Sequence, residues 1–334
     1  MIHTAVLSLA VVLSPSLMAA DYNLKFAHFF PAKATAAQHF STWAKQVEKD
    51  SEGRIKIDMY PSQTLAKAPK TYDAVINGIA DLGVTIQGYT ANRFPLTQIA
   101  ELPGLAKSSK QGTCVVQNLY DEGLLKEEFS DVHPLFLFTH GAGHIHTSNK
   151  AITKPSDLKG LKIRRPTIVV AELLKQLGAQ PVGMPAPNTY QSLSRGVLDG
   201  LAMPWDGVYK FRLNELTKYH TEIGLYTAVF ALSMNKRVYE SMPADLRAVI
   251  DRNSGLVHAL DTSKDFDRID IKGRAQAKDE NHQIIKIEGG IDHPDWKGVV
   301  EQATQSYLSG LEAKGMPANK IYKRAQALAG ECEV

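Results

Sequence analysis

Residues 24–59, LKFAHFFPAKATAAQHFSTWAKQVEKDSEGRIKIDM, decide the fold. Apolar and polar residues alternate at both ends of this stretch, which predicts two β-strands with the apolar residues Leu24 and Phe26 in the first and Ile55, Ile57 and Met59 in the second. Between them, apolar residues recur at the spacing of a helix face: Phe40, Trp43, Ala44 and Val47. We expect Thr35 to cap this helix and Gly53 to end it. A strand, a helix and a strand in this order predict a parallel pair with a right-handed crossover, and so an α/β fold.

The rest of the chain continues the same alternation of helices and strands. A helix over 67–77 and a strand over 81–86 follow the opening unit, and the sequence around Gly78-Ile-Ala-Asp81 is echoed at Gly196-Val-Leu-Asp199. Residues 242–278 look helical, 284–287 form a late strand, and closing helices cover 306–310 and 319–328. Two similar α/β lobes fit a chain of 334 residues.

The first 20 residues differ from the rest. They contain no Lys, Arg, Asp or Glu, and an apolar run is followed by Pro15 and the small residues Ala19-Ala20. This pattern is typical of a signal peptide, with a buried N-terminal helix as the alternative. No other stretch approaches the ~18 apolar residues of a membrane span, so we expect an exported, soluble protein from Asp21 onward.

Composition excludes several classes of function. The formal net charge is only +3 and no basic run reaches five residues, so nucleic-acid binding is not expected. The two cysteines, Cys114 and Cys332, are too few for a disulfide framework or a thiolate zinc site. One bridge between them is possible, and the sequence leaves their pairing open.

Residues 139–147, THGAGHIHT, form the densest polar cluster. His144 and His146 would project from the same face of a strand, as metal ligands sometimes do. No Asp or Glu lies between Asp131 and Asp157, so we expect neither a metal nor another cofactor. The chain also lacks the G-x-S-x-G, G-x-x-x-x-G-K-[ST] and H-E-x-x-H motifs. A metal-dependent hydrolase or lyase using His140, His144 and His146 remains the alternative from another class.

Two further motifs indicate ligand binding. In a strand over 161–165, Arg164 and Arg165 would point to opposite faces, so one of them can enter a cleft. A guanidinium donates two parallel hydrogen bonds to a carboxylate, which lysine cannot match. Met203-Pro204-Trp205 follows a predicted strand, where pockets form at a sheet's carboxyl edge. The alternatives are solvated arginines and a packing tryptophan.

The chain resembles the periplasmic substrate-binding proteins of TRAP transporters, the DctP-like family, over nearly all of 21–330. The matching pieces, in order, are 24–28 (LKFAH), 51–55 (SEGRI), 60–63 (YPSQ), 94–95 (FP), 101–103 (ELP), 157–164 (DLKGLKIR), 199–200 (DG), 234–236 (MNK) and 242–246 (MPADL). The resemblance implies a two-lobed α/β periplasmic binding protein fold with hinge strands and long lobe-spanning helices. We expect a signal peptide over 1–20, the first part of lobe I over 21–147 and the main part of lobe II over 148–235. Residues 236–334 would cross the hinge and complete both lobes.

The resemblance also implies that Arg164 clamps the carboxylate of a ligand bound between the lobes. Members that bind sialic acid place a second arginine where this chain has His144, an asparagine at Met203 and a polar residue at Phe29. These replacements remove charge and add apolar surface, which favours a small monocarboxylate with an apolar or aromatic body. A sugar acid would leave hydroxyl groups unsatisfied, at about 1–3 kcal/mol each.

The remaining predicted contacts are polar or aromatic. His144 would donate a hydrogen bond to the ligand, Gln87 would add a polar contact, and apolar walls would come from Phe29, Met203, Trp205 and Phe230, with His28 as a weaker candidate. The resemblance implies a periplasmic receptor, not an enzyme, that delivers its ligand to TRAP permease subunits. We expect a monomer. A sensory role with the same fold is a further alternative.

Overall fold

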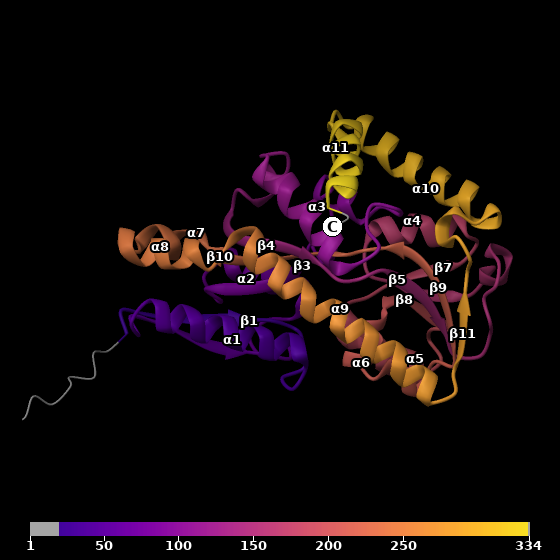
Figure 1. Ribbon diagram of the computed structural model, residues 1–334, viewed down its shortest axis with the longest axis horizontal. Helices are drawn as coiled ribbons and strands as arrows, with labels where there is room; N and C mark the ends of the chain where they lie inside the picture. The colour runs from indigo at the N-terminus through magenta and orange to yellow at the C-terminus, as the bar shows by residue number, and fades with distance from the viewer. Residues whose placement is uncertain (1–19, 333–334) are drawn as a thin grey trace, which may run out of the picture.

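The computed structural model describes residues 20–332. It contains two sheets, each of which forms the centre of one lobe (Figure 1). The first sheet has the strand order β2-β1-β3-β10-β4, with β1 at Tyr22–Ala27, β2 at Ile55–Tyr60, β3 at Leu82–Ile86, β4 at Val132–Thr139 and β10 at Val229–Asn235. The second has the order β11-β9-β5-β8-β6-β7, with β5 at Gly143–Thr147, β6 at Lys162–Arg165, β7 at Gln180–Gly183, β8 at Gly200–Pro204, β9 at Tyr219–Tyr226 and β11 at Gln283–Lys286. The predicted two-lobed α/β fold is confirmed.

The helices cover both sheets. Their bounds are α1 Thr35–Asp50, α2 Thr71–Ile76, α3 Ser109–Asp121, α4 Ile168–Gln176, α5 Thr189–Ser194, α6 Trp205–Lys210, α7 Lys236–Ser241, α8 Ala244–Arg252, α9 Gly255–Asp279, α10 Pro294–Glu312 and α11 Ala318–Glu331. Helix α9 runs diagonally across both lobes and packs against α1 and α3 of the first lobe and α6 of the second (Figure 1). None of the helices within residues 20–332 combines the length and apolar character needed to cross a membrane.

The opening unit forms as its periodicity predicts. Strands β1 and β2 pair in parallel, and the four apolar residues predicted for the helix face are all buried in α1. The predicted cap is wrong by one position: Ala34 is the N-cap residue, without a side-chain hydrogen bond, and Thr35 is the first helical residue. Gly53 ends the connection with a φ of +81°, a conformation that glycine adopts without steric cost.

Two strand pairs cross from one lobe to the other. Strand β4 belongs to the first sheet and β5 to the second, whereas β9 belongs to the second and β10 to the first. The pairs are antiparallel neighbours, β4 with β10 and β5 with β9, so they form a two-stranded hinge ribbon. The chain therefore passes between the sheets before each expected boundary. It leaves the first sheet before β5, ahead of the boundary after 147, and returns to it at β10, ahead of the boundary after 235. The expected signal peptide, 1–20, lies outside the described residues except for Ala20.

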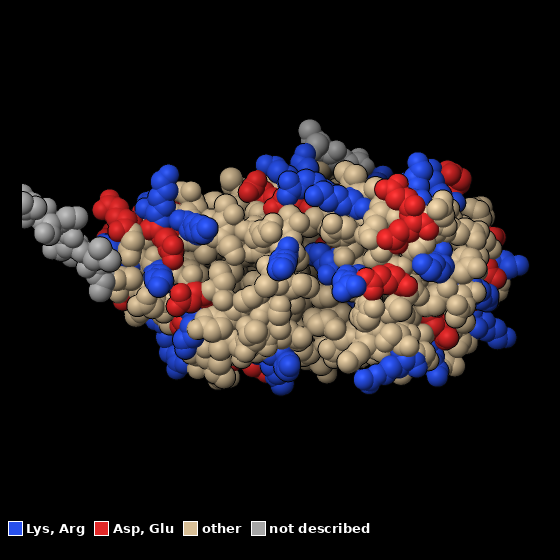
Figure 2. Space-filling model, turned by 90° about the horizontal axis from the view of Figure 1, so that it is seen from below, with Lys and Arg blue, Asp and Glu red and all other residues tan. Residues whose placement is uncertain are grey.

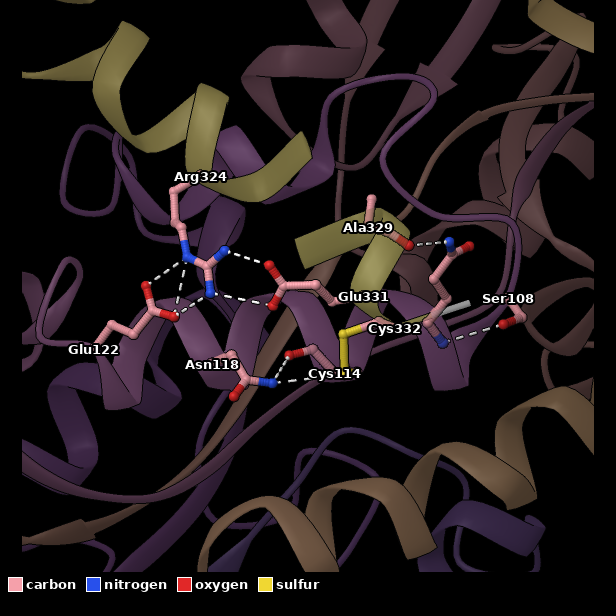
Figure 3. The surroundings of a disulfide bond; sticks show 9 residues. Ser108, Cys114, Asn118, Glu122, Arg324, Ala329, Glu331 and Cys332 are labelled. Carbon is pink, nitrogen blue, oxygen red and sulfur yellow. Dashed lines mark hydrogen bonds and ion pairs between the residues drawn. A yellow bond between two sulfur atoms is a disulfide. The ribbon is translucent and has the colours of Figure 1, made fainter. Parts of the chain in front are cut away.

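The two cysteines form a disulfide, which resolves the pairing that the sequence left open. Cys114 of α3 and Cys332, directly after α11, have Cα atoms 5.9 Å apart and are separated by 218 residues in sequence (Figure 3). Beside them, Arg324 of α11 binds both Glu122 and Glu331 (Figure 3). The C-terminal helix is thus attached to the first lobe by a covalent bond and by a charged network.

Candidate functional site

A small cavity lies between the two sheets, beside the hinge ribbon. Its lining comes from both lobes and is mostly aromatic or aliphatic: Phe29, Phe30, Ile86, His140, Arg164, Pro166, Ala186, Met203, Pro204, Asp206, Gly207, Lys210, Phe211, Tyr226 and Phe230. A mostly apolar cavity with a few convergent polar groups is the usual form of a small-molecule site.

Arg164 carries a positive charge into this cavity. Strand β6 places it there, 1% exposed, and its Nε and Nη1 donate to the carbonyl oxygens of Met184 and Ala202, both at 3.1 Å. Nη2 donates to the Tyr89 hydroxyl at 3.2 Å. No carboxylate of the described residues forms an ion pair with Arg164. A buried charge without an opposite charge is costly, so this position favours an anion from outside the chain.

The other charges of the cavity compensate one another. Lys210 and Asp206, four residues apart on α6, form an ion pair with side chains only 3% exposed. The Lys210 ammonium also lies 4.8 Å from the ring centre of Phe30 and 4.1 Å from that of Phe266, at cation–π distances. Burial, together with the charge of Asp206, raises the pKa of nearby Asp270 well above its usual value, which favours its uncharged form. The cavity therefore has one uncompensated positive charge, that of Arg164.

Aromatic rings form the apolar walls. Phe29 and Phe230 are stacked at 6.4 Å between ring centres, and Phe30 stacks on Phe230 at 6.1 Å. Tyr226, at the end of β9, lies against Gly143, where an added Cβ would lie 2.1 Å from the ring. The Tyr226 hydroxyl is buried and has no hydrogen-bond partner among the described residues. The cavity is thus walled by aromatic rings and has an unsatisfied hydroxyl in its lining.

Half of the predicted contact residues lie in this cavity. Arg164, Met203, Phe29 and Phe230 all line it, and Met203 Sδ lies 3.7 Å from Arg164 Nη1. They come from four different strands or strand ends, which the fold brings together. Their role in binding remains a prediction.

His144 and Trp205 are not part of the cavity lining. His144 accepts hydrogen bonds from the backbone N–H groups of Ile223 and Gly224, both at 3.2 Å, and lies against a separate surface groove. Trp205 donates to Glu222 Oε1 at 2.9 Å and packs in the core of the second lobe. Both side chains therefore have structural partners away from Arg164.

His28 and Gln87 are buried in the first lobe, also outside the cavity lining. His28 packs among Phe26, Phe30 and Phe40, and burial lowers the pKa of His28 to about 4. The Gln87 Oε1 accepts from the Thr85 hydroxyl at 2.7 Å. These contacts favour a packing role for both.

The three histidines of the alternative hypothesis do not converge. His140 Nε2 accepts from the backbone N–H of Ala228 at 3.1 Å, and His146 bonds to His220 and to the Met203 carbonyl, whereas His144 faces β9. Across residues 20–332, no three His, Cys, Asp or Glu side chains are grouped so that they could hold a metal ion. The geometry gives the hydrolase or lyase hypothesis no support.

Sequence reasoning missed four polar residues around the cavity: Tyr89, Asp206, Lys210 and Tyr226. Asp206 and Lys210 carried a usable signal, because an acid and a base four residues apart on a helix can pair. Their helix also begins directly after the strand that ends at Pro204. Nothing local distinguishes Tyr89 and Tyr226 from the other ten tyrosines of the chain.

The fold is that of a two-lobed solute-binding protein, and comparison with known proteins agrees. The family model of bacterial extracellular solute-binding proteins, family 7 (DctP), matches residues 26–308. The chain belongs to this family, whose members include TRAP solute-binding proteins. The predicted membership is confirmed.

The chain is similar to solved TRAP solute-binding proteins and to a dicarboxylate-binding periplasmic protein. A marine metagenome TRAP solute-binding protein specific for aromatic acid ligands, solved with metahydroxyphenylacetate, is 34% identical with a TM-score of 0.90, over 94% of this chain and 100% of that one. A TRAP solute-binding protein from Rhodoferax ferrireducens, solved with copurified benzoate, is 34% identical with a TM-score of 0.88, over 93% and 98%. The C4-dicarboxylate-binding periplasmic protein DctP of Rhodobacter capsulatus is 25% identical over 84% of this chain and 81% of its own length.

Proposed function

We propose that this protein is a periplasmic receptor for a small aromatic monocarboxylate, which it delivers to a TRAP permease. The observation that carries the proposal is the single uncompensated charge of Arg164 inside a cavity walled by phenylalanines. One carboxylate balances that charge, and the aromatic body of such a ligand can pack against Phe29 and Phe230. The two relatives at 34% identity, one specific for aromatic acids and one holding benzoate, support this ligand class.

The four predicted residues that line the cavity have distinct roles in this proposal. Arg164 binds the carboxylate, and Phe29, Met203 and Phe230 contact the apolar body. His28, Gln87, His144 and Trp205 are left out of the contact set, because each has structural partners elsewhere. Contacts from both lobes favour the closed form, so binding and hinge closure are coupled.

Export through the signal peptide, delivery to permease subunits and a monomeric state are further parts of the proposal. The Cys114–Cys332 disulfide supports export, because disulfides persist in oxidising compartments such as the periplasm. Basic and acidic side chains are interspersed over the face seen in Figure 2, as on an ordinary soluble surface. This is consistent with the expectation that the protein binds no nucleic acid.

A dicarboxylate ligand is the second candidate, because of the relative from Rhodobacter capsulatus. The charge balance disfavours it here. Lys210 is already paired with Asp206, so a second carboxylate would enter the cavity without a free cation to neutralise it.

Calorimetric titration with benzoate, 3-hydroxybenzoate, succinate and glucuronate tests the proposal. We expect the two aromatic acids to bind and the other two to bind at least tenfold more weakly. Arg164→Lys should weaken benzoate binding by roughly tenfold or more, because an ammonium cannot replace the planar fork that holds Met184, Ala202 and the ligand together. Arg165→Lys, next along β6 and outside the cavity lining, is the matched control and should bind normally. Tight succinate binding, or an Arg164→Lys variant with unchanged affinity, contradicts the proposal.

A further inference from the structure

Tyr89 connects the two lobes at the edge of the cavity. It belongs to a short 3-10 turn, Gln87–Tyr89, that follows β3 of the first sheet. Its hydroxyl nevertheless reaches the second lobe, where it accepts from the backbone N–H of Ala186 at 2.9 Å and from Arg164 Nη2 at 3.2 Å. The residue before it, Gly88, makes this approach possible, since a Cβ there would lie 2.3 Å from Thr167 Cγ2 of the second lobe.

The Tyr89 hydroxyl and the Arg164 guanidinium each retain an unused hydrogen-bond donor. The Tyr89 oxygen accepts two hydrogen bonds, and among the described residues no acceptor takes its own proton. Burial raises the pKa of Tyr89, so the hydroxyl stays protonated and available as a donor.

Arg164 has few donors left for a ligand. Of its five N–H groups, Nε–H and one on Nη1 are taken by carbonyl oxygens, and one on Nη2 by Tyr89. The second N–H of Nη1 faces the sulfur of Met203 at 3.7 Å. One N–H of Nη2, next to the Tyr89 hydroxyl, is left without a protein partner.

We propose that the ligand carboxylate bridges Arg164 Nη2 and the Tyr89 hydroxyl, so that Tyr89 is a ligand-binding residue that completes the anion site only when the lobes close. This inference rests on the proposed function and deepens it. The anion is held by one donor from each lobe instead of by both prongs of the arginine, which is how carboxylate binding stabilises closure. When the lobes separate, Tyr89 leaves with the first lobe and the site loses half of its donors.

Tyr89→Phe tests this directly, because it keeps the ring and removes the hydroxyl. A hydrogen bond to a charged group is strong enough that we expect benzoate affinity to fall by roughly ten- to a hundredfold. The loss should come from faster dissociation, with the association rate within about threefold of wild type, since the contact forms after closure. Tyr190→Phe is the matched control: its hydroxyl binds Glu215 on the surface of the second lobe, and its loss should leave benzoate binding unchanged.

A double-mutant cycle tests whether Tyr89 and Arg164 act on the ligand together. Tyr89→Phe combined with Arg164→Lys should lose less affinity than the sum of the two single variants, because both act on one carboxylate. Additive losses contradict the bridge. If Tyr89→Phe binds benzoate like wild type while Arg164→Lys does not, the inference is wrong and the proposed function stands. If the wild-type protein binds no aromatic acid, the proposed function itself fails.

A crystal structure of the wild-type protein with benzoate gives an answer that depends on no variant. The Tyr89 hydroxyl oxygen should lie within about 3.0 Å of one carboxylate oxygen of the ligand. Arg164 Nη2 should donate to the same oxygen or to the other oxygen of that carboxylate. A separation beyond about 3.5 Å, or a carboxylate bound by both prongs of Arg164 alone, overturns the inference.

Discussion

At the scale of single residues, Glu101 is a buried acid next to the hinge, and its titration is expected to make the stability of the protein depend on pH. It is fully buried at the end of the 3-10 turn Thr97–Glu101, and its Oε1 accepts from the backbone N–H of Val229, the first residue of hinge strand β10, at 3.0 Å. Its Oε2 has no hydrogen-bond partner among the described residues. Burial raises the pKa of Glu101 to about 8, although the Val229 bond acts in the opposite direction.

A pH dependence of stability follows from this shift. The unfolded chain releases the Glu101 proton near its ordinary pKa of 4.5, whereas the folded chain keeps it up to about 8. The folded state therefore binds more protons between these values, and stability from this group falls as pH rises from 4.5 to 8. Glu101→Gln keeps an oxygen for Val229 and cannot ionise. We expect it to melt above the wild type at pH 8, with a smaller difference at pH 5, in thermal unfolding monitored by circular dichroism.

The control for this comparison is Glu127→Gln, at an exposed position in the 3-10 turn Lys126–Phe129. Its melting temperature should follow that of the wild type at both pH values. An equal shift of Glu101→Gln at pH 5 and pH 8 would mean that the substitution acts through packing and not through the proton.

At the scale of elements, a chain of three histidines joins the strands of the second sheet. His146 of β5 donates from Nε2 to the Met203 carbonyl of β8 at 3.0 Å, which leaves its Nδ1 to accept from His220 Nδ1 of β9 at 2.8 Å. His220 Nε2 then accepts from His282 Nδ1 at 3.0 Å, and His282 Nε2 accepts from the Lys218 ammonium at 3.0 Å. The two ends, a carbonyl and an ammonium, determine every tautomer, and each histidine is neutral.

Acid is expected to destabilise this arrangement. Burial is the largest cause of a lowered pKa at all three histidines. It lowers the pKa of His146 and His282, and it lowers the pKa of His220 to about 3. The unfolded chain takes up these protons near pH 6.5 and the folded chain does not, so stability is lost as pH falls below 6.5, by up to about 1.4 kcal/mol per pH unit for each histidine.

Urea unfolding at pH 7, 6 and 5 measures this slope, and His220→Gln tests its origin. The amide of glutamine also offers one donor side and one acceptor, but it takes up no proton in this range. We expect the variant to be less stable than wild type at pH 7, with a shallower loss of stability toward pH 5. Parallel slopes for the two proteins would show that the histidine chain is not the source.

At the scale of the whole molecule, the disulfide attaches the last helix to the first lobe. The bridge closes a loop of 218 residues that includes the whole second sheet, so it restricts the unfolded chain strongly. We expect the double variant Cys114→Ser, Cys332→Ser to lose about 2–4 kcal/mol in the free energy of unfolding, measured with urea.

Ligand binding provides the control for the disulfide. Neither cysteine lines the cavity, and α11 packs on α3, α10 and the 3-10 turn Thr97–Glu101, all outside the cavity lining. Benzoate affinity of the double variant should therefore remain within about twofold of wild type. A large loss of affinity would show that the C-terminal helix influences the hinge through the 3-10 turn Thr97–Glu101, which contacts both α11 and β10.

Much of this architecture could be predicted from short-range patterns. The opening strands and helix, the late strand near 284–287 and the long helical region after Met242 all form where period 2 or period 3.6 predicts them, because an element's buried face is set by the spacing of its own residues. Arg164 was predicted to be a site residue from its place on a strand and from the resemblance. The N-cap was predicted one residue too late, at Thr35 instead of Ala34, since helix ends depend on local backbone geometry that spacing does not determine.

The sequence by itself determined the class of protein, the two-lobed α/β fold and the choice of Arg164 as a candidate site residue. The tertiary structure alone decided which side chains share a cavity with that arginine. His144 faces β9 and Trp205 packs in the second-lobe core, whereas Tyr89 reaches Arg164 from the first lobe and Tyr226 lines the cavity from the second. The physical reason is that a site between two lobes is assembled by long-range pairing of strands and by hinge closure. No local periodicity records which residues such contacts bring together.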